Sequence, residues 1–250
     1  MSDVRVLAFG VLRDALGPDA TRITMPEGAT VGDLLAQIAE KHPNAALRGI
    51  AVSVNAEYAN LSRVLRNDDE VGLLPPVSGG SGAASATGPL SKSADESAIV
   101  TALTREPIDE QRLVDAAKQG EDGAVVVFDG IVRNNSRGRQ TLYLDYEAYQ
   151  EMAAKQIEGL AREARNRFSV RHVTIVHRLG RLHVGETSVL IVVASAHRAQ
   201  AYEASRWLID TLKKTVPIWK KETFVDGAVW ADGEPFPAGF AVEGADGASE

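Results

Sequence analysis

The 250-residue chain contains no cysteine, and this absence excludes several kinds of chemistry. Disulfide bonds, thiolate metal ligands and cysteine nucleophiles all need a thiol, so any sulfur chemistry here cannot use a protein thiol. Four of the five histidines also lack the paired spacing that a metal site needs, and we expect no metal; these are His42, His172, His177 and His183.

The sequence also lacks a long apolar run and an excess of positive charge. No stretch approaches the roughly 20 apolar residues of a membrane-spanning helix, and no signal peptide precedes the first patterned segment. The formal net charge is −7, whereas unspecific binding to nucleic acid needs a broad basic surface. We therefore expect a cytoplasmic protein that binds neither membranes nor nucleic acid. Walker, dinucleotide and Gly-x-Ser-x-Gly motifs are absent too, which disfavours those enzyme classes.

A low-complexity segment divides a chain of otherwise ordinary globular composition. Residues 81–97 are mainly Ser, Gly, Ala and Thr, which is typical of a flexible linker. The sequence therefore predicts one domain at residues 1–80, a second at 98–240, and a disordered acidic tail at 241–250.

The first domain has the pattern of a small β-grasp fold. Period-two alternation predicts strands at residues 4–9, 21–25, 51–55 and 70–74, with a short helical turn at 11–16. Thr30 is a suitable N-cap for a helix that Pro43 ends. The last strand leads into Gly79-Gly80, which is either part of a flexible linker or a slender probe, because glycine has no Cβ to obstruct a narrow channel.

The second domain mixes strands and helices. We expect strands at residues 99–103, 123–128, 142–149, 173–178, 181–184, 187–195 and 223–230, and helices after Asp109, at 150–168 and from 198 to Pro217. The continuous apolar run at 123–128 predicts a strand buried on both faces. A basic, turn-rich loop at 129–138 follows it.

Basic side chains gather near the end of this domain. Between Arg198 and Glu222 there are six basic and three acidic residues, although the domain as a whole is negative. This excess favours an anion site, and the alternative is a solvated helix face whose lysines match the helix dipole. Lys213 and Lys220 flank a Pro-terminated corner, and a lysine near apolar surface and another cation can acquire a lowered pKa.

Two further candidates for anion binding lie earlier in the domain. His197 and Arg198 stand at a predicted strand-to-helix junction, where backbone N–H groups attract anions and arginine can grip phosphate. Arg133 stands in the loop after the apolar strand. The alternatives are a capping histidine and solvated arginines.

Together the two domains resemble the small and large subunits of molybdopterin synthase, fused in one chain. Residues 1–80 are similar to the ubiquitin-like sulfur carrier through the ending LLPPVSGG at 73–80. The second domain resembles the catalytic large subunit through GAVVVFDGIVRN at 123–134, EARNRF at 163–168, VHRLG at 176–180, SAHR at 195–198 and LKKTVPIWKKE at 212–222.

The resemblance implies an α+β protein with an N-terminal β-grasp domain, a flexible linker and a C-terminal α/β hammerhead domain. It also implies that two sulfurs pass from a thiocarboxylate on Gly80 to cyclic pyranopterin monophosphate, giving the dithiolene of molybdopterin, with no permanently bound cofactor. Lys213 and Lys220 would be the catalytic lysines. The residues implied in substrate binding are Phe128, Arg133, His197 and Arg198.

The family likeness further implies partners. An adenylating enzyme would load the sulfur, and the catalytic domain would form a homodimer in which His197 and Arg198 complete the partner's pocket. The chain departs from the pattern after Trp230, where Asp232 and Glu234 replace a basic residue of some relatives.

A second departure is more serious, because Ser81 follows Gly80 and makes its carbonyl an amide that cannot be thiolated. The first hypothesis is activation by a protease that cleaves between these two residues. The second is a catalytic domain served by a carrier on another chain. A third, of a different class, is a noncatalytic anion-binding scaffold that recruits an adenylating enzyme through its ubiquitin-like domain.

Overall fold

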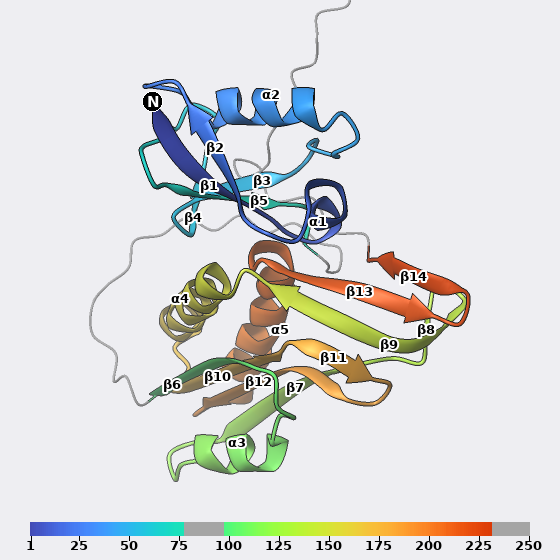
Figure 1. Ribbon diagram of the computed structural model, residues 1–250. Helices are drawn as coiled ribbons and strands as arrows, with labels where there is room; N and C mark the ends of the chain where they lie inside the picture. The colour runs from blue at the N-terminus through green and yellow to red at the C-terminus, as the bar shows by residue number, and fades with distance from the viewer. Residues whose placement is uncertain (78–97, 232–250) are drawn as a thin grey trace, which may run out of the picture. The chain divides into compact units, whose positions relative to one another are not determined.

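The computed structural model describes residues 1–77 and 98–231, which belong to two compact units (Figure 1). Each unit has its own sheet and its own hydrophobic core. None of the helices in these two ranges is long and apolar enough to cross a membrane. The sequence predictions for the linker, the tail and Gly80 fall outside the described residues.

The first unit is a five-stranded sheet with the order β2-β1-β5-β3-β4, in which the central pair β1 and β5 is parallel. Helix α2 packs on one face and buries an apolar stripe against the sheet. This arrangement confirms the predicted β-grasp fold, although the short strand β4 was not expected. The elements are β1 (Ser2–Ala8), α1 (Val11–Leu16), β2 (Thr21–Met25), α2 (Val31–Lys41), β3 (Ala51–Val54), β4 (Glu57–Ala59) and β5 (Glu70–Leu74).

The start of α2 follows from local sequence. The Thr30 hydroxyl accepts a hydrogen bond from the Asp33 backbone N–H, and the Asp33 carboxylate accepts one from the Thr30 N–H at 2.8 Å. This reciprocal capping box satisfies two donors that a helix start leaves without partners. The predicted cap at Thr30 is confirmed.

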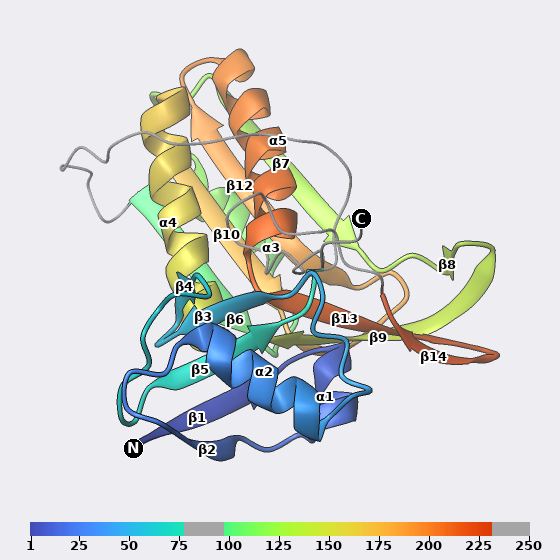
Figure 2. The ribbon, with the colours of Figure 1, turned by 90° about the horizontal axis from the view of Figure 1, so that it is seen from above.

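The second unit contains a four-stranded sheet with the order β6-β10-β12-β7. Helices α4 and α5 lie side by side on one face and cover the main core, and α3 covers the other face (Figure 2). The elements are β6 (Ile99–Thr104), α3 (Glu110–Ala117), β7 (Ala124–Ile131), α4 (Gln150–Phe168), β10 (His172–Arg178), β12 (Thr187–Ser195) and α5 (Arg198–Thr215).

A second sheet in this unit has the order β11-β9-β13-β14, with β8 paired to β9. Its strands are β8 (Asn135–Ser136), β9 (Arg139–Ala148), β11 (Gly180–His183), β13 (Ile218–Phe224) and β14 (Gly227–Trp230). The single closing strand predicted at residues 223–230 is wrong, because the chain reverses at Val225 and Asp226 and forms a hairpin.

The prediction that residues 123–128 are buried on both faces is also wrong. Strand β7 is an edge strand, since among the described strands it pairs only with β12. Its residues are half-buried or exposed, and Val127 is 37% exposed. A continuous apolar run is typical of a central strand, but the strand order gives β7 only one neighbour.

Candidate functional site

The predicted site residues of the second unit divide between the two ends of its four-stranded sheet. Strands β6, β7 and β10 run in one direction and β12 runs in the other. We call the end where β7 and β10 finish the lysine end, and the end where β12 finishes the histidine end. Helix α5 starts at the histidine end and runs back across the sheet to the lysine end.

Lys220 at the lysine end is held by a carboxylate. It lies on β13, and its ammonium forms an ion pair with Glu222 at 3.0 Å; the two side chains are 28% and 10% exposed. Residues two apart on a strand point to the same face, so the pairing follows from the strand itself. This ion pair fixes the position of the ammonium.

Tyr146 and His177 form the surroundings of Lys220. Tyr146 lies on β9 directly opposite Lys220, and its ring packs edge-on against His177, with 5.2 Å between centroids. Burial lowers the pKa of His177 to about 4, and its Nδ1 lies 2.9 Å from the Arg178 carbonyl oxygen. That contact places the proton of the neutral ring on Nδ1. At neutral pH the buried His177 ring is therefore uncharged, and it contacts Tyr146, which lies opposite Lys220.

Lys213 reaches the lysine end from the last turn of α5. Its side chain is half-buried. The helix ends at Thr215, and the chain turns at Val216 and Pro217 into β13, where Trp219 is buried. The two lysines thus flank a corner, as the sequence predicted, and a cation in the last helical turn is favoured by the helix dipole.

Arg133 belongs to the lysine end as well. The residue before it, Val132, is buried and packs against Leu144 and Leu182 of the second sheet. Leu144 lies on β9 and Leu182 on β11, so this cluster places the exposed Arg133 near these two strands, and β9 pairs with the strand that carries Lys220. Val132 also exchanges backbone hydrogen bonds with Glu186 and Gly185, at 3.0 and 2.8 Å, which anchors the start of the loop.

Phe128 lies further back along β7, opposite Ile191, and packs partly against the main core. Gly130, two residues on, leaves space for its ring. A Cβ at Gly130 would lie 2.6 Å from Val189 Cγ1 and 3.3 Å from Phe128 Cε1. Gly130 is therefore needed for close packing on the face of β7 that contributes to the main core.

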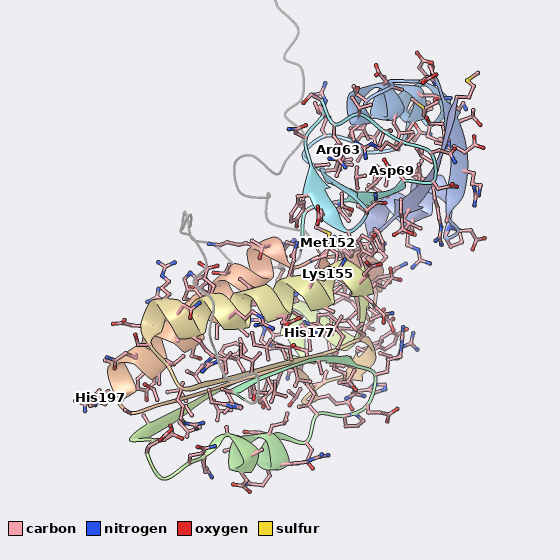
Figure 3. All side chains as sticks on the ribbon, turned by 90° about the vertical axis from the view of Figure 1, so that its left-hand side faces the viewer. Arg63, Asp69, Met152, Lys155, His177 and His197 are labelled. Atoms are coloured by element: carbon pink, nitrogen blue, oxygen red, sulfur yellow. The ribbon has the colours of Figure 1, made fainter. Side chains whose placement is uncertain are left out.

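His197 and Arg198 lie at the histidine end. His197 is the N-cap residue of α5 and Arg198 its first residue, and both side chains are exposed. Arg198 and Lys213 are in the first and last turns of α5, about 22 Å apart at the usual helical rise. Figure 3 shows His197 at one extremity of this unit, far from His177. The fold therefore does not bring the two groups together within one chain.

The structure also identifies residues that the sequence did not single out. Glu222 was counted only as one of the acids in the cluster, although its spacing of two from Lys220 on a strand was a readable signal. Tyr146 had no such signal, because its position depends on the pairing of β9 with β13. Within residues 1–77 and 98–231 no group of three or more His, Asp or Glu side chains could hold a metal ion.

These features define a class: a β-grasp domain joined in one chain to an α+β domain whose basic side chains are divided between the two ends of a sheet. The MoaE protein family matches residues 103–215, and the ThiS family matches residues 6–80. The molybdopterin synthase catalytic subunit of Halalkalibacterium halodurans is 43% identical over 129 residues, which cover 52% of this chain and 83% of that protein. The chain belongs to the family of molybdopterin synthase catalytic subunits.

A second relative agrees with this assignment. The molybdopterin synthase catalytic subunit of Pyrococcus abyssi is 45% identical over 112 residues, covering 45% of this chain and 76% of that protein. The crystal structure of molybdopterin synthase from Staphylococcus aureus is 41% identical and covers 51% of this chain and 93% of its own, with a TM-score of 0.49.

Proposed function

We propose that the protein is a molybdopterin synthase, a sulfurtransferase of molybdenum cofactor biosynthesis that converts cyclic pyranopterin monophosphate to molybdopterin. The observation that carries the proposal is the lysine end, where Glu222 fixes Lys220 and to which α5 and the loop after β7 bring Lys213 and Arg133. Family membership supports the same reaction.

The chemistry of the reaction fits the residue types. The cyclic phosphate is an anion, which Arg133, His197 and Arg198 would bind through charge-assisted hydrogen bonds. Sulfur transfer from an acyl donor develops negative charge on oxygen and sulfur, and a fixed ammonium stabilises such charge and supplies protons. Lys220 would act in this way from the position in which the ion pair with Glu222 holds it, and Lys213 would approach from the adjacent corner.

A complete pocket would need two copies of the chain. One copy holds Arg133, Lys213 and Lys220 at one end of the sheet and His197 and Arg198 at the other, about 22 Å away along α5. A homodimer related by a two-fold axis would bring the histidine end of one copy to the lysine end of the other, and would do so twice.

The carrier would be residues 1–80, with residues 81–97 as the linker and 98–240 as the catalytic domain. The sulfur would be carried as a thiocarboxylate on Gly80, loaded by an adenylating enzyme after a protease has cleaved the bond to Ser81. The match of the ThiS family to residues 6–80 supports this assignment, because the match ends at that glycine.

The experiment is an assay of the purified chain with cyclic pyranopterin monophosphate and a sulfur-loading system, read by mass spectrometry. We expect the product to gain two sulfur atoms and the protein to be recovered as two fragments that separate after Gly80. Product formed by an uncut chain would contradict the cleavage step. Full product formation by both Lys213→Ala and Lys220→Ala would contradict the catalytic role and favour a scaffold.

A further inference from the structure

The junction between β12 and α5, which presents His197 and Arg198, is packed directly against a glycine. The Gly123 backbone N–H donates a hydrogen bond to the Ser195 carbonyl at 3.0 Å. A Cβ built on Gly123 would lie 2.2 Å from the Ala196 carbonyl oxygen. Real side chains do not approach a backbone oxygen so closely, so only glycine is compatible with this position of Ala196.

A buried ion pair holds the same junction from the other side. The Arg171 backbone N–H donates to the Ala194 carbonyl at 3.0 Å, one residue before the contact that Gly123 makes. The Arg171 guanidinium binds both carboxylate oxygens of Asp122, the residue next to Gly123, and also the Ala117 carbonyl. The Asp122 side chain is 4% exposed, and its pKa is lowered chiefly by the hydrogen bonds from Arg171.

These contacts form a closed brace around the end of β12. Arg171 is hydrogen-bonded to Ala194, and Gly123 is hydrogen-bonded to Ser195. The ion pair between Asp122 and Arg171 connects the two segments that make these hydrogen bonds. Strand β7 is further held by its pairing with β12, which begins at Ala124 opposite Ser195. Ala196, in contrast, is exposed and lies in the turn. A side chain at position 123 would therefore displace the Ala196 peptide rather than the strand.

The displacement would reach His197 and Arg198 because these two residues follow Ala196 directly in the chain. The His197 backbone N–H lies 3.4 Å from the Ser195 hydroxyl oxygen, to which it donates, and His197 then caps α5. Its side chain makes no capping hydrogen bond to the helix. The direction of His197 and Arg198 is thus set by the backbone of residues 195 and 196.

We propose that Gly123, held by the ion pair between Asp122 and Arg171, is a positioning residue that aims His197 and Arg198 at the anionic substrate. The inference rests on the proposed function, in which these two side chains complete the pocket of a second copy. The inference gives Asp122, Gly123 and Arg171 a role in substrate recognition, although these residues lie at the opposite end of the sheet from the lysines.

The test compares Gly123→Ala with Gly120→Ala in the full chain. Gly120 is the matched control, because a Cβ there meets nothing within 4 Å. We expect Gly123→Ala to raise KM for cyclic pyranopterin monophosphate by about tenfold or more, with kcat changed much less, since a misaimed anion grip weakens binding. Gly120→Ala keeps the wild-type KM. A wild-type KM in Gly123→Ala would overturn the inference.

Mixed dimers distinguish a misplacement of His197 and Arg198 from a general loss of structure. At substrate concentrations well below the raised KM, Gly123→Ala mixed with Lys220→Ala should recover activity, because one pocket then combines an intact lysine end with an intact histidine end. Gly123→Ala mixed with Arg198→Ala should not recover, since both defects lie at the histidine end. Recovery with Arg198→Ala, or failure with Lys220→Ala alone, would contradict the inference.

Two further outcomes keep the inference apart from the proposed function. If Arg198→Ala and Lys220→Ala do not recover activity with each other, the shared pocket is wrong, and the KM of Gly123→Ala alone then decides whether Gly123 aims the cations. If Gly123→Ala does not fold, Asp122→Asn weakens the brace without adding a side chain. Asp122→Asn should raise KM by less than is expected for Gly123→Ala, and it should recover activity with Lys220→Ala but not with Arg198→Ala. An unchanged KM in Asp122→Asn would overturn the role of the ion pair.

Discussion

The two ends of the four-stranded sheet hold their basic side chains in opposite ways. At the lysine end, Lys220 is paired with the nearly buried Glu222, and a neutral, buried His177 packs against Tyr146, which lies opposite Lys220. At the histidine end, His197 and Arg198 are exposed, and the ion pair of Asp122 with Arg171 joins the two segments that hold the preceding backbone.

This difference shows where each end is preorganised. The lysine end fixes the charged atom itself, which suits a group that must act on reacting atoms. The histidine end fixes only the backbone and leaves the side chains of His197 and Arg198 in solvent, where water weakens any contact with an anion. The first arrangement fits the catalytic role proposed for Lys220, and the second fits the proposal that His197 and Arg198 act in the pocket of another copy.

The largest effect should come from combining defects of the two ends. Lys220→Ala removes the fixed ammonium and should lower turnover about 10²–10⁴-fold, the usual contribution of an acid or base. An equimolar exchange with Arg198→Ala makes about half of the dimers mixed, each with one intact pocket of two, so about a quarter of the wild-type activity should return. Steady-state assays before and after subunit exchange measure this. No recovery would mean that each chain contains a whole site.

The next largest effect concerns the ion pairs. Arg171→Ala removes the guanidinium from the part-buried Asp122 carboxylate, which keeps only the hydrogen bond from the Gln119 N–H, and should lower the free energy of unfolding by about 1.5–3 kcal/mol. Arg181→Ala is the control, because the pair of Arg181 with Asp145 is exposed and should change the free energy of unfolding much less. Denaturant titration of the two variants checks the comparison, and equal losses would contradict it.

The pH dependence of stability tests the lysine end. The pKa of His177 falls from 6.5 to about 4 on burial, so near pH 5 the unfolded chain binds a proton that the native chain does not. The contribution of the neutral His177 to the free energy of unfolding is therefore complete above pH 6.5. It is lost as the pH falls toward 4, which lowers the free energy of unfolding by about 3 kcal/mol.

His177→Asn keeps a donor for the Arg178 carbonyl but does not titrate. The loss of stability between pH 7 and pH 4.5 should therefore be smaller in this variant than in the wild type, as measured by thermal unfolding at each pH. Equal losses in the two proteins would show that His177 is not the group responsible.

The smallest effect should come from a site that belongs to neither end. Gly159 lies in the middle of α4, and a Cβ there meets nothing within 4 Å. Gly159→Ala should raise the free energy of unfolding by about 0.5–1 kcal/mol, since alanine has the higher helix propensity. Its KM and kcat should equal those of the wild type. A changed KM would mean that α4 couples the two ends.

Several elements could be predicted because their signals are local. Helix α4 was predicted at the residues where it occurs, and Thr30 was predicted as the cap of α2. The hairpin of β13 and β14 was missed although Asp226-Gly227 is a typical turn signal. The edge position of β7 could not be predicted, because an apolar run gives the composition of a strand and not the number of its neighbours.

The sequence predicted which residues could belong to the site, but it did not predict which of them lie together. The sequence indicated Lys213, Lys220, Arg133, His197 and Arg198 by charge and by family likeness, and their roles stay predictions. It did not indicate Gly123, whose importance comes from an oxygen 73 residues later in the chain. A glycine in a strand could equally have marked a bulge or a flexible point.

By itself the sequence determined the local elements, the family and the chemical types of the site, because caps, periodicity and motifs depend on neighbouring residues. Only the tertiary structure decided which side chains meet. The packing of α5 across the sheet places Arg198 and Lys213 at opposite ends of the strands, the register of β13 on β9 places Tyr146 opposite Lys220, and burial keeps His177 neutral. Each of these depends on pairing and desolvation between segments far apart in the chain, which local sequence patterns do not encode.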